Sequence, residues 1–239
     1  MSSGPLSSIK TAPDEPRTLN ERIYLQLRED ILNGKLSPGT KLRFEMLKTM
    51  YAAGTSTLRE SLSRLAAENL VVGEGQRGFT VAPVSLGDLH DLTRTRQDLE
   101  SIALRRSIEQ GDDDWEAAVL AASHRLSKLT DPATGRLVLL PDEAVRRHRA
   151  FHLALVSACN SAWLLHFIRL LYDQSERYRR FSTLHAIVPR DTAAEHRELV
   201  DATLGRNADR AERLLREHLE RTAEVVTAIS ASWDGGKEE

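Results

Sequence analysis

The sequence predicts a mostly α-helical protein in two parts, a small N-terminal module with one β-hairpin and a larger all-α bundle. Three observations lead to this fold class. Aromatic residues make up only 5% of the 239-residue chain, which disfavours a fold built only from strands. Residues 70–83 contain two short apolar runs separated by glycines, as in a tight hairpin. From residue 85 onward, apolar residues recur at helical spacing and no stretch alternates like a strand.

The length of the chain allows one large domain or two small ones, each with a core of useful size. We expect a polar tail over residues 1–17, the N-terminal module over 18–83, the bundle over 84–231 and a polar tail over 232–239. A single cysteine, Cys159, excludes an internal disulfide and suits a reducing cytoplasm. No apolar run is long enough to cross a bilayer, and the first residues lack a signal-peptide pattern. We therefore expect a cytoplasmic protein without a membrane partner.

The N-terminal module has the order of elements of a winged helix-turn-helix. Its first helix places Ile23, Leu27 and Ile31 on one face, and Gly34 follows as a stop signal. In order, we expect helices over residues 19–33, 42–47 and 57–68, with a small-residue turn over 52–56 before the third helix, and strands over 70–72 and 79–83.

The third helix of the module carries residues suited to DNA opposite its inward-facing leucines. Arg59 could form a bidentate contact with guanine, worth about 1–3 kcal/mol of discrimination, and Arg64 can also face outward. Ser56 and Thr57, with the free N–H groups of the first turn, suit phosphate oxygens. At the hairpin tip, Gln76, Arg77 and Gly78 combine a glycine suited to positive φ with an arginine that could enter a minor groove.

The alternative interpretation is that arginines on a short helix are solvated surface charges, which is the usual case for any single arginine. DNA binding is favoured because several features occur together in this order: the helices, the turn, the hairpin and the basic residues. Residues 35–77 hold seven basic and four acidic side chains, a local net charge of +3, whereas residues 84–239 hold 22 basic and 26 acidic ones. The positive charge is therefore local to the predicted reader. Because this excess is modest, tight binding would need two copies of the chain.

The bundle is predicted from helical periodicity and from caps and breakers. Ser85 can cap its first helix, Gly111 can end that helix, and the acidic residues from Asp112 to Asp114 suit the start of the next one. Pro132 and Gly135 indicate a loop between the second and third helices. In order, we expect helices over residues 85–110, 112–129, 141–159, 163–181, 191–204 and 208–229.

Four histidines of the bundle occupy positions where apolar residues are expected. His148 and His152 are four residues apart on the inner face of one helix, a spacing that suits two ligands of one metal ion. His196 and His218 lie in the inner stripes of two later helices. A set of nitrogen ligands suits Zn²⁺, Ni²⁺ or Cu²⁺ better than Mg²⁺ or Ca²⁺. A lone interior histidine is more often a satisfied core residue, but four of them with one such pair favour a divalent metal site, with zinc as the first choice and nickel as the second.

Arg96 shows the same anomaly on the inner stripe of the first bundle helix. A buried guanidinium must be paired, so Arg96 faces either a carboxylate such as Glu100 or a bound anion, and the sequence leaves both open. Ser175 and Tyr178, on the predicted helix over residues 163–181, could add hydrogen bonds in the same cavity. Arg96, Ser175 and Tyr178 are therefore the candidate effector-binding residues.

The N-terminal module resembles the GntR family of bacterial transcription regulators. The resemblance rests on the segments at residues 38–42 (Pro-Gly-Thr-x-Leu), 58–62 (Leu-Arg-Glu-Ser-Leu) and 75–81 (Gly-Gln-Arg-Gly-Phe-x-Val). The family often has Ser-Arg at the start of the recognition helix, where this chain has Gly54-Thr55, which puts the operator sequence in doubt. The resemblance implies that Arg43, Arg59, Arg64 and the Arg77-Gly78 tip contact DNA, with Thr55 in the place of the usual arginine.

The bundle resembles the FCD effector domain of the FadR-like subfamily. The matching residues are Arg96, Leu99-Glu100, Phe151-His152, Asn160, Glu195-His196 and His218. The resemblance implies a helical bundle that often holds a metal through one Asp and three His residues and senses small organic acids. His148 stands where the family often has Asp. The nearest likeness is to the subgroup that contains the glutarate-responsive repressor of carbon-starvation genes.

Together these patterns predict a homodimeric transcription regulator that binds palindromic double-stranded operator DNA. We expect a repressor that a small carboxylate releases from DNA. The competing interpretation is a metal-dependent hydrolase with an accessory nucleic-acid-binding module. It is disfavoured because the histidine pair is flanked by Arg146, Arg147 and Arg149 and lacks a well-placed acidic base. A third interpretation, a structural DNA-binding protein, would have no ligand.

Overall fold

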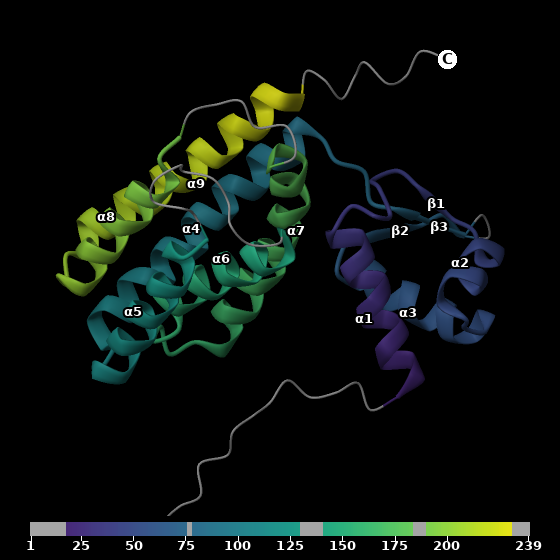
Figure 1. Cartoon of the computed structure of the whole chain (residues 1–239), viewed down its shortest axis with the longest axis horizontal. Coiled ribbons are helices and arrows are strands. Elements are labelled where there is room, and N and C mark those ends of the chain that lie inside the picture. The colour runs from purple at the N-terminus through teal and green to yellow at the C-terminus, as the bar shows by residue number, and fades with distance from the viewer. Residues whose placement is uncertain (1–17, 76–77, 130–140, 184–189, 231–239) are drawn as a thin grey trace, which may run out of the picture. The chain divides into compact units, whose positions relative to one another are not determined.

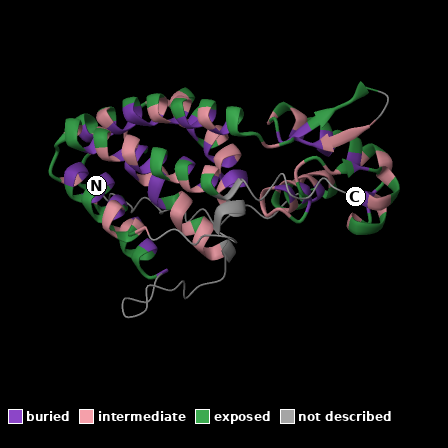
Figure 2. Cartoon of the chain, turned by 90° about the horizontal axis from the view of Figure 1, so that it is seen from above, coloured by how far each residue is buried: buried purple, intermediate pink, exposed green. Residues whose placement is uncertain are grey.

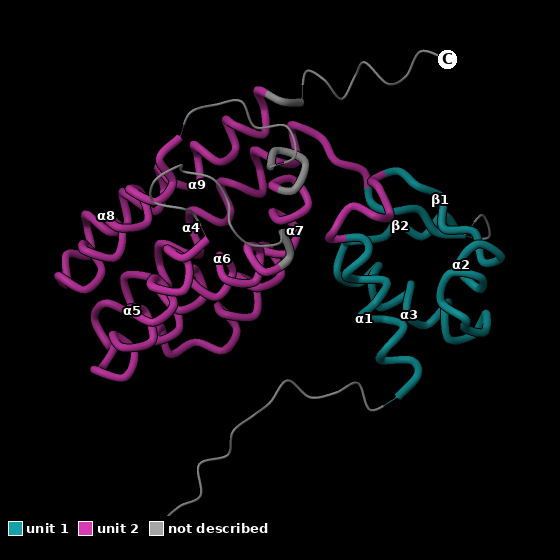
Figure 3. Tube along the Cα trace, viewed as in Figure 1, with its two compact units in different colours: residues 1–31, 39–82 teal, residues 32–38, 83–239 magenta. Residues whose placement is uncertain are grey.

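The computed structural model describes residues 18–75, 78–129, 141–183 and 190–230. It divides into two compact units, which are considered separately (Figure 3). Unit 1 comprises the residues up to 31 together with 39–82, and unit 2 comprises residues 32–38 and those from 83 onward. The predicted tails lie outside the described residues.

Unit 1 consists of three helices and a small antiparallel sheet in which β3 lies between β1 and β2 (Figure 1). Leu42 pairs with Phe79, and Val72 pairs with Thr80. The elements are α1 (Leu19–Leu32), β1 (Lys41–Leu42), α2 (Phe44–Tyr51), α3 (Thr55–Ala67), β2 (Val71–Gly73) and β3 (Phe79–Val81).

The core of unit 1 forms because each helix has one apolar face. The leucines of α3 at positions 58, 62 and 65 are fully buried, as are Leu27 of α1 and Leu47 of α2. Burial of such side chains contributes about 1.5–3 kcal/mol each. The apolar stripe thus fixes which side of α3 is turned outward.

Two details of unit 1 differ from the sequence prediction. Thr55 and Ser56 belong to α3, so the turn before this helix is shorter than expected and runs from Ala52, whose φ is 48°, to Gly54. The second helix begins at Phe44, not at residue 42, because Lys41 and Leu42 pair with β3. A two-residue strand carries too little alternation to be recognised in a sequence.

Unit 2 is an all-α bundle. Side chains cap five of its helices: Ser85 accepts from the backbone N–H of Asp88, Asp112 from that of Trp115 and Asp191 from that of Ala194. Ser161 and Asn207 do the same before the fourth and the last helix, for Leu164 and Arg210. Among the described helices, none has the length and apolarity needed to span a membrane. The helices are α4 (Leu86–Gln110), α5 (Asp113–Ser127), α6 (Pro141–Val156), α7 (Ala162–Thr183), α8 (Thr192–Leu204) and α9 (Ala208–Ser230).

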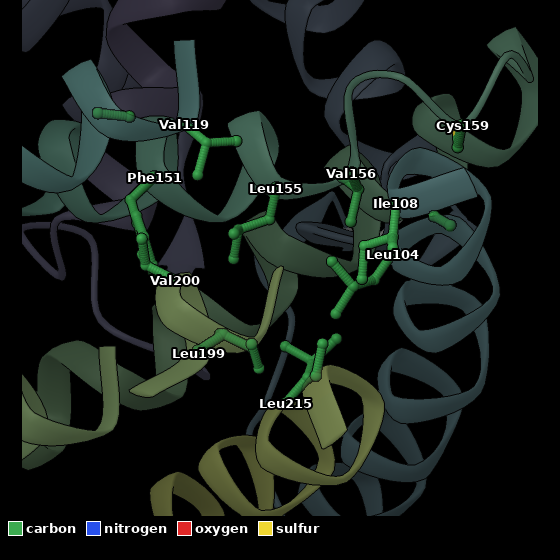
Figure 4. Close-up of a cluster of buried hydrophobic side chains, with 14 of the residues drawn as sticks. Leu104, Ile108, Val119, Phe151, Leu155, Val156, Cys159, Leu199, Val200 and Leu215 are labelled. Carbon is green, nitrogen blue, oxygen red and sulfur yellow. The ribbon is translucent and has the colours of Figure 1, made fainter. Parts of the chain in front are cut away.

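The helices of unit 2 enclose one large apolar core (Figure 4). Phe151 and Leu155 of α6 meet Leu199 of α8 and Leu215 of α9 in this core, and each is at most 1% exposed. Buried and exposed residues alternate around the helices at a helical period (Figure 2). The prediction of a mostly α-helical fold with an N-terminal winged helix-turn-helix is confirmed. The polar groups on the buried faces therefore need a separate explanation.

Candidate metal and effector site and candidate DNA-binding face

The four histidines singled out in the sequence lie together in unit 2. His148 and His152 come from α6, His196 from α8 and His218 from α9, and one ring nitrogen of each lies within 4.8 Å of the others. Three of the side chains are less than one-tenth exposed. We call these four residues the histidine cluster. It is a group that could hold a metal ion.

The imidazoles of the histidine cluster are in the protonation state that a metal requires. Burial lowers the pKa of His148, His152 and His196 well below the usual value, and also lowers that of His218. They are therefore neutral at pH 7, with a lone pair on one nitrogen of each ring. The Nε2 atoms of His148 and His152 lie 3.2 Å apart. Two nitrogens bound to one zinc ion at about 2.1 Å lie about 3.4 Å apart in tetrahedral geometry, so the observed separation fits.

Two fully buried ring nitrogens of the histidine cluster have no hydrogen-bond partner within the described residues. They are Nε2 of His196 and Nδ1 of His152, both buried. Leaving a buried polar atom unpaired costs about 1–3 kcal/mol. A ligand in the cavity would remove the cost of burying an unpaired nitrogen, for a nitrogen that faces the ligand. The set of four imidazole nitrogens fits a divalent transition metal.

Glu195 fixes the tautomer of His218. Its carboxylate Oε2 lies 2.8 Å from Nδ1 of His218, and it also accepts from the guanidinium of Arg190 at 2.6 Å. Burial alone would raise the pKa of Glu195, but Arg190 and His218 outweigh it and hold that pKa well below its usual range. An ionised carboxylate only accepts hydrogen bonds, so the hydrogen of His218 is on Nδ1, and the unprotonated Nε2 keeps a lone pair available for a metal ion.

Arg96 is paired with Glu100, the first of the two alternatives that the sequence left open, whereas its contact with a bound anion stays a prediction. Its Nε–H donates to Glu100 Oε1 at 2.7 Å, and its NH1 group donates to Ser175 Oγ at 2.6 Å. It also lines a cavity next to the histidine cluster, with a volume of about 10 Å³. This cavity is lined by Arg96, His148, His152, Tyr172, Ser175, Glu176, Arg179, His218, Leu219 and Thr222.

Tyr178 does not line this cavity, contrary to the sequence prediction. Its hydroxyl donates to Asp88 Oδ2 at 2.5 Å and accepts from the backbone N–H of Ser85 at 3.3 Å, and its ring packs against Leu89 and Leu92. Tyr172 lies in the cavity instead, with its hydroxyl 2.7 Å from Nδ1 of His148.

Two of the cavity residues that sequence reasoning missed, Tyr172 and Arg179, share a helical spacing on α7 with Ser175, which it found. Tyr172 lies four residues after Ile168, Ser175 three residues further and Arg179 four residues after that, and Tyr172, Ser175 and Arg179 all line the cavity. This spacing could have indicated that the three side chains share one face of α7. The sequence does not single out Tyr172, because the neighbouring residue Leu171 is apolar and fits the inner stripe of the helix equally well.

The predicted DNA contacts lie at the start of α3 and of α2. Arg59 and Ser56 are exposed, and Thr55 and Thr57 are partly exposed, all within the first five residues of α3. Arg43 is exposed and precedes α2 as its N-cap residue. We call these five residues the candidate DNA-binding face.

Four further predicted contacts lie elsewhere or outside the described residues. Arg64 is exposed, but it lies further along α3 and its guanidinium carbon sits 3.7 Å from the ring centroid of Tyr24 in α1. Gly78 has a φ of 101°, which favours glycine. Gln76 and Arg77 lie outside the described residues.

Comparisons with known proteins identify the family from both units. Residues 19–81 match the model of bacterial regulatory proteins of the gntR family, and residues 91–221 match the FCD domain model. The chain belongs to the GntR family of regulators with a C-terminal FCD domain. It is 45% identical over 210 residues to the uncharacterized HTH-type transcriptional regulator BphR of Paraburkholderia xenovorans, covering 88% of this chain and 86% of BphR.

Another relative has a more specific name. The HTH-type transcriptional repressor GlaR of Escherichia coli is 40% identical over 200 residues, which covers 82% of this chain and 90% of GlaR. The fold is similar to that of E. coli McbR/YncC, with a TM-score of 0.71 at 20% identity over 88% of this chain and 98% of that one. These findings show a DNA-binding transcription regulator, not an enzyme, and give no support to the hydrolase interpretation.

Proposed function

We propose that this regulator is a homodimeric repressor that a small carboxylate releases from a palindromic operator. The carboxylate would bind in unit 2 next to a metal ion held by the histidine cluster. The observation that carries this proposal is the convergence of four neutral imidazoles, three of which, those of His148, His152 and His218, line one cavity together with Arg96. The repressor GlaR, with 40% identity, supports the direction of control.

The histidine cluster would hold the metal through one nitrogen each of His148, His152, His196 and His218. Zinc is the first candidate, and nickel or copper would suit the same nitrogen donors. When bound, the ion supplies a positive charge that attracts an anionic oxygen. Glu195 would keep Nε2 of His218 directed at it, as a carboxylate partner does for many metal-binding histidines.

Arg96 and Ser175 would bind the effector carboxylate. Arg96 already shares its guanidinium between Glu100 and Ser175, so it is held in place before an effector arrives. Arg96 and Arg179 come from different helices and line the same cavity, but each is paired with a carboxylate, Glu100 and Glu176 respectively. The preference for an anionic effector would therefore come mainly from the metal ion, with the guanidinium N–H groups adding hydrogen bonds.

The small size of the cavity implies that unit 2 changes its conformation when an effector binds. A volume of about 10 Å³ is close to that of one water-sized sphere, far too small for a carboxylic acid. We infer that side chains or helices that line the cavity move apart when an acid binds. A ligand that fits only the widened state stabilises that state by its difference in affinity for the two states, typically about 1–3 kcal/mol.

The same conformational change would alter DNA binding by changing the distance between the recognition helices α3 of the two copies. Half-sites of a palindromic operator lie about 34–36 Å apart, so a small rotation of either α3 weakens binding. Two copies of the chain are needed to use such an operator. The modest local charge of +3 over residues 35–77 also favours two copies over one.

Metal analysis and a ligand screen test the proposal. Elemental analysis of the purified chain should find zinc or nickel, and removal with a chelator should lower the thermal unfolding temperature. A thermal-shift screen of small mono- and dicarboxylates should then raise that temperature only in the metal-loaded protein, in proportion to RT ln(1 + [L]/Kd). A chain that holds no metal, or that responds equally to acids after chelation, would contradict the proposal.

A further inference from the structure

Phe44 lies where the recognition helix and the hairpin sheet of unit 1 meet. Its ring faces that of Phe79 in β3 edge to face, with centroids 6.5 Å apart and an interplanar angle of 89°. The guanidinium carbon of Arg59 in α3 lies 5.2 Å from the centroid of the Phe44 ring. One side chain at the first turn of α2 therefore contacts both elements that reach toward DNA in this fold.

The position of Phe44 follows from the strand that precedes it. β1 ends at Leu42, which pairs with Phe79 of β3, and Arg43 then begins α2. Phe44 thus leaves the sheet directly beside Phe79, and the start of α3 brings Arg59 over its ring. The backbone pairing of β1 with β3 fixes the ring relative to the sheet.

An aromatic ring restricts an arginine without using up its hydrogen bonds. The attraction between the guanidinium and the face of the ring limits the rotamers of an exposed arginine. The N–H edge of the guanidinium stays available for a planar bidentate contact with a base. Arg59 therefore loses less conformational freedom when it binds guanine, and the benefit applies only where the matching base is present.

We propose that Phe44 is a positioning residue for DNA reading, which orients Arg59 toward base edges and sets the recognition helix relative to the hairpin. The inference rests on the proposed contact of Arg59 with DNA. A residue with this role affects the preference for one DNA sequence over another. It has little effect on general attraction to phosphate, which depends on charge.

The test compares affinities for two duplexes on the same protein sample. One is a duplex recovered from a randomised DNA library by repeated selection with the unaltered chain, and the other is a shuffled duplex of the same composition. Phe44→Leu should lower the ratio of the two affinities by about fivefold, in line with the loss of a cation–π contact. Affinity for the shuffled duplex and its salt dependence should stay within about twofold. Because both values come from one sample, an inactive fraction cancels in the ratio.

Three variants separate positioning from a merely structural role. Phe44→Tyr keeps the ring and should restore the ratio. Met50→Leu, on the exposed side of the same helix, should leave it unchanged. In the double variant with Arg59→Ala, replacing Phe44 should have almost no further effect, because the side chain it orients is gone.

Several results would overturn the inference. An unchanged ratio in Phe44→Leu would do so, as would an equal loss from that substitution with and without Arg59. Should Phe44→Leu fail to fold, Phe44→Met, which keeps an apolar side chain without a ring, must show the same loss. If Arg59→Ala itself binds the selected duplex normally, the proposed DNA contact is wrong, and that outcome is distinct from failure of the Phe44 inference.

Discussion

Arg59 and Ser56 on the candidate DNA-binding face are exposed, whereas His152, His196 and His218 of the histidine cluster are 3%, 8% and 4% exposed. The first group consists of charged and polar side chains in contact with water. The second consists of neutral rings whose charge has been suppressed by burial. A site for a macromolecule can stay solvated until its partner arrives. A site for an ion has to be assembled by the fold.

This difference predicts that the two sites fail independently. In unit 2, His152→Ala should reduce metal affinity by more than about 100-fold, because loss of a direct ligand costs more than loss of an outer partner. His124→Ala, at an exposed position of α5, is the matched control and should bind metal normally. Elemental analysis and isothermal titration with zinc measure the effect. Full retention of metal by His152→Ala would remove it from the ligand set.

In unit 1, Arg59→Ala should weaken binding to a selected duplex by about tenfold to a hundredfold, the loss expected for one bidentate base contact. Metal content should not change. Arg22→Ala, exposed on α1, is the control for loss of one positive charge. Quantitative footprinting on the selected duplex checks this. Equal losses in the two variants would show that Arg59 contributes only charge.

The same difference explains how much the sequence could predict. A histidine or arginine within an apolar helical stripe is a polar residue at a position where an apolar one is expected. Helical periodicity alone therefore singles out His148, His152, His196 and Arg96 as candidate site residues. Tyr172 gives no such signal, because a tyrosine is common in a buried helical stripe whether or not its hydroxyl faces a cavity. Only the coordinates separate it from Tyr178, six residues later, whose hydroxyl binds Asp88 instead.

In unit 1, the pattern of apolar and polar side chains predicts which face of α3 is exposed. It does not predict which residues of other elements that face contacts. The inward leucines of α3 determine that Arg59 points outward. The contact between Arg59 and Phe44 joins residues from two helices, and it depends on a two-residue strand too short to be recognised. Local periodicity holds no information about such distances, which the packing of α2, α3 and β3 determines.

Acid should affect unit 2 through the histidine cluster. Burial lowers the pKa of its histidines in the folded state, whereas an unfolded histidine titrates near about 6.5. Below that pH the unfolded chain binds more protons, so the free energy of unfolding falls with decreasing pH, by up to about 1.4 kcal/mol per pH unit for each histidine. Stability from these groups is fully present above about pH 6.5.

Thermal unfolding in the presence of chelator, at several pH values between about 7.5 and 5, measures this dependence. His152→Ala should make it shallower, because one of the titrating groups has been removed, while His124→Ala should leave the slope as it is. The opposite sign, with greater stability in acid, would mean that the cluster is charged in the folded state.

The smallest effect is expected at Arg64, which lies on the recognition helix but differs from Arg59 in its partner. Its guanidinium carbon is 3.7 Å from the ring centroid of Tyr24, which ties α3 to α1 within unit 1. Arg64→Ala should therefore lower the free energy of unfolding by about 0.5–1 kcal/mol. It should weaken binding to selected and shuffled duplexes alike, in contrast to Arg59→Ala. Denaturant unfolding and the two-duplex comparison measure both quantities, and a loss confined to the selected duplex would place Arg64 among the base contacts.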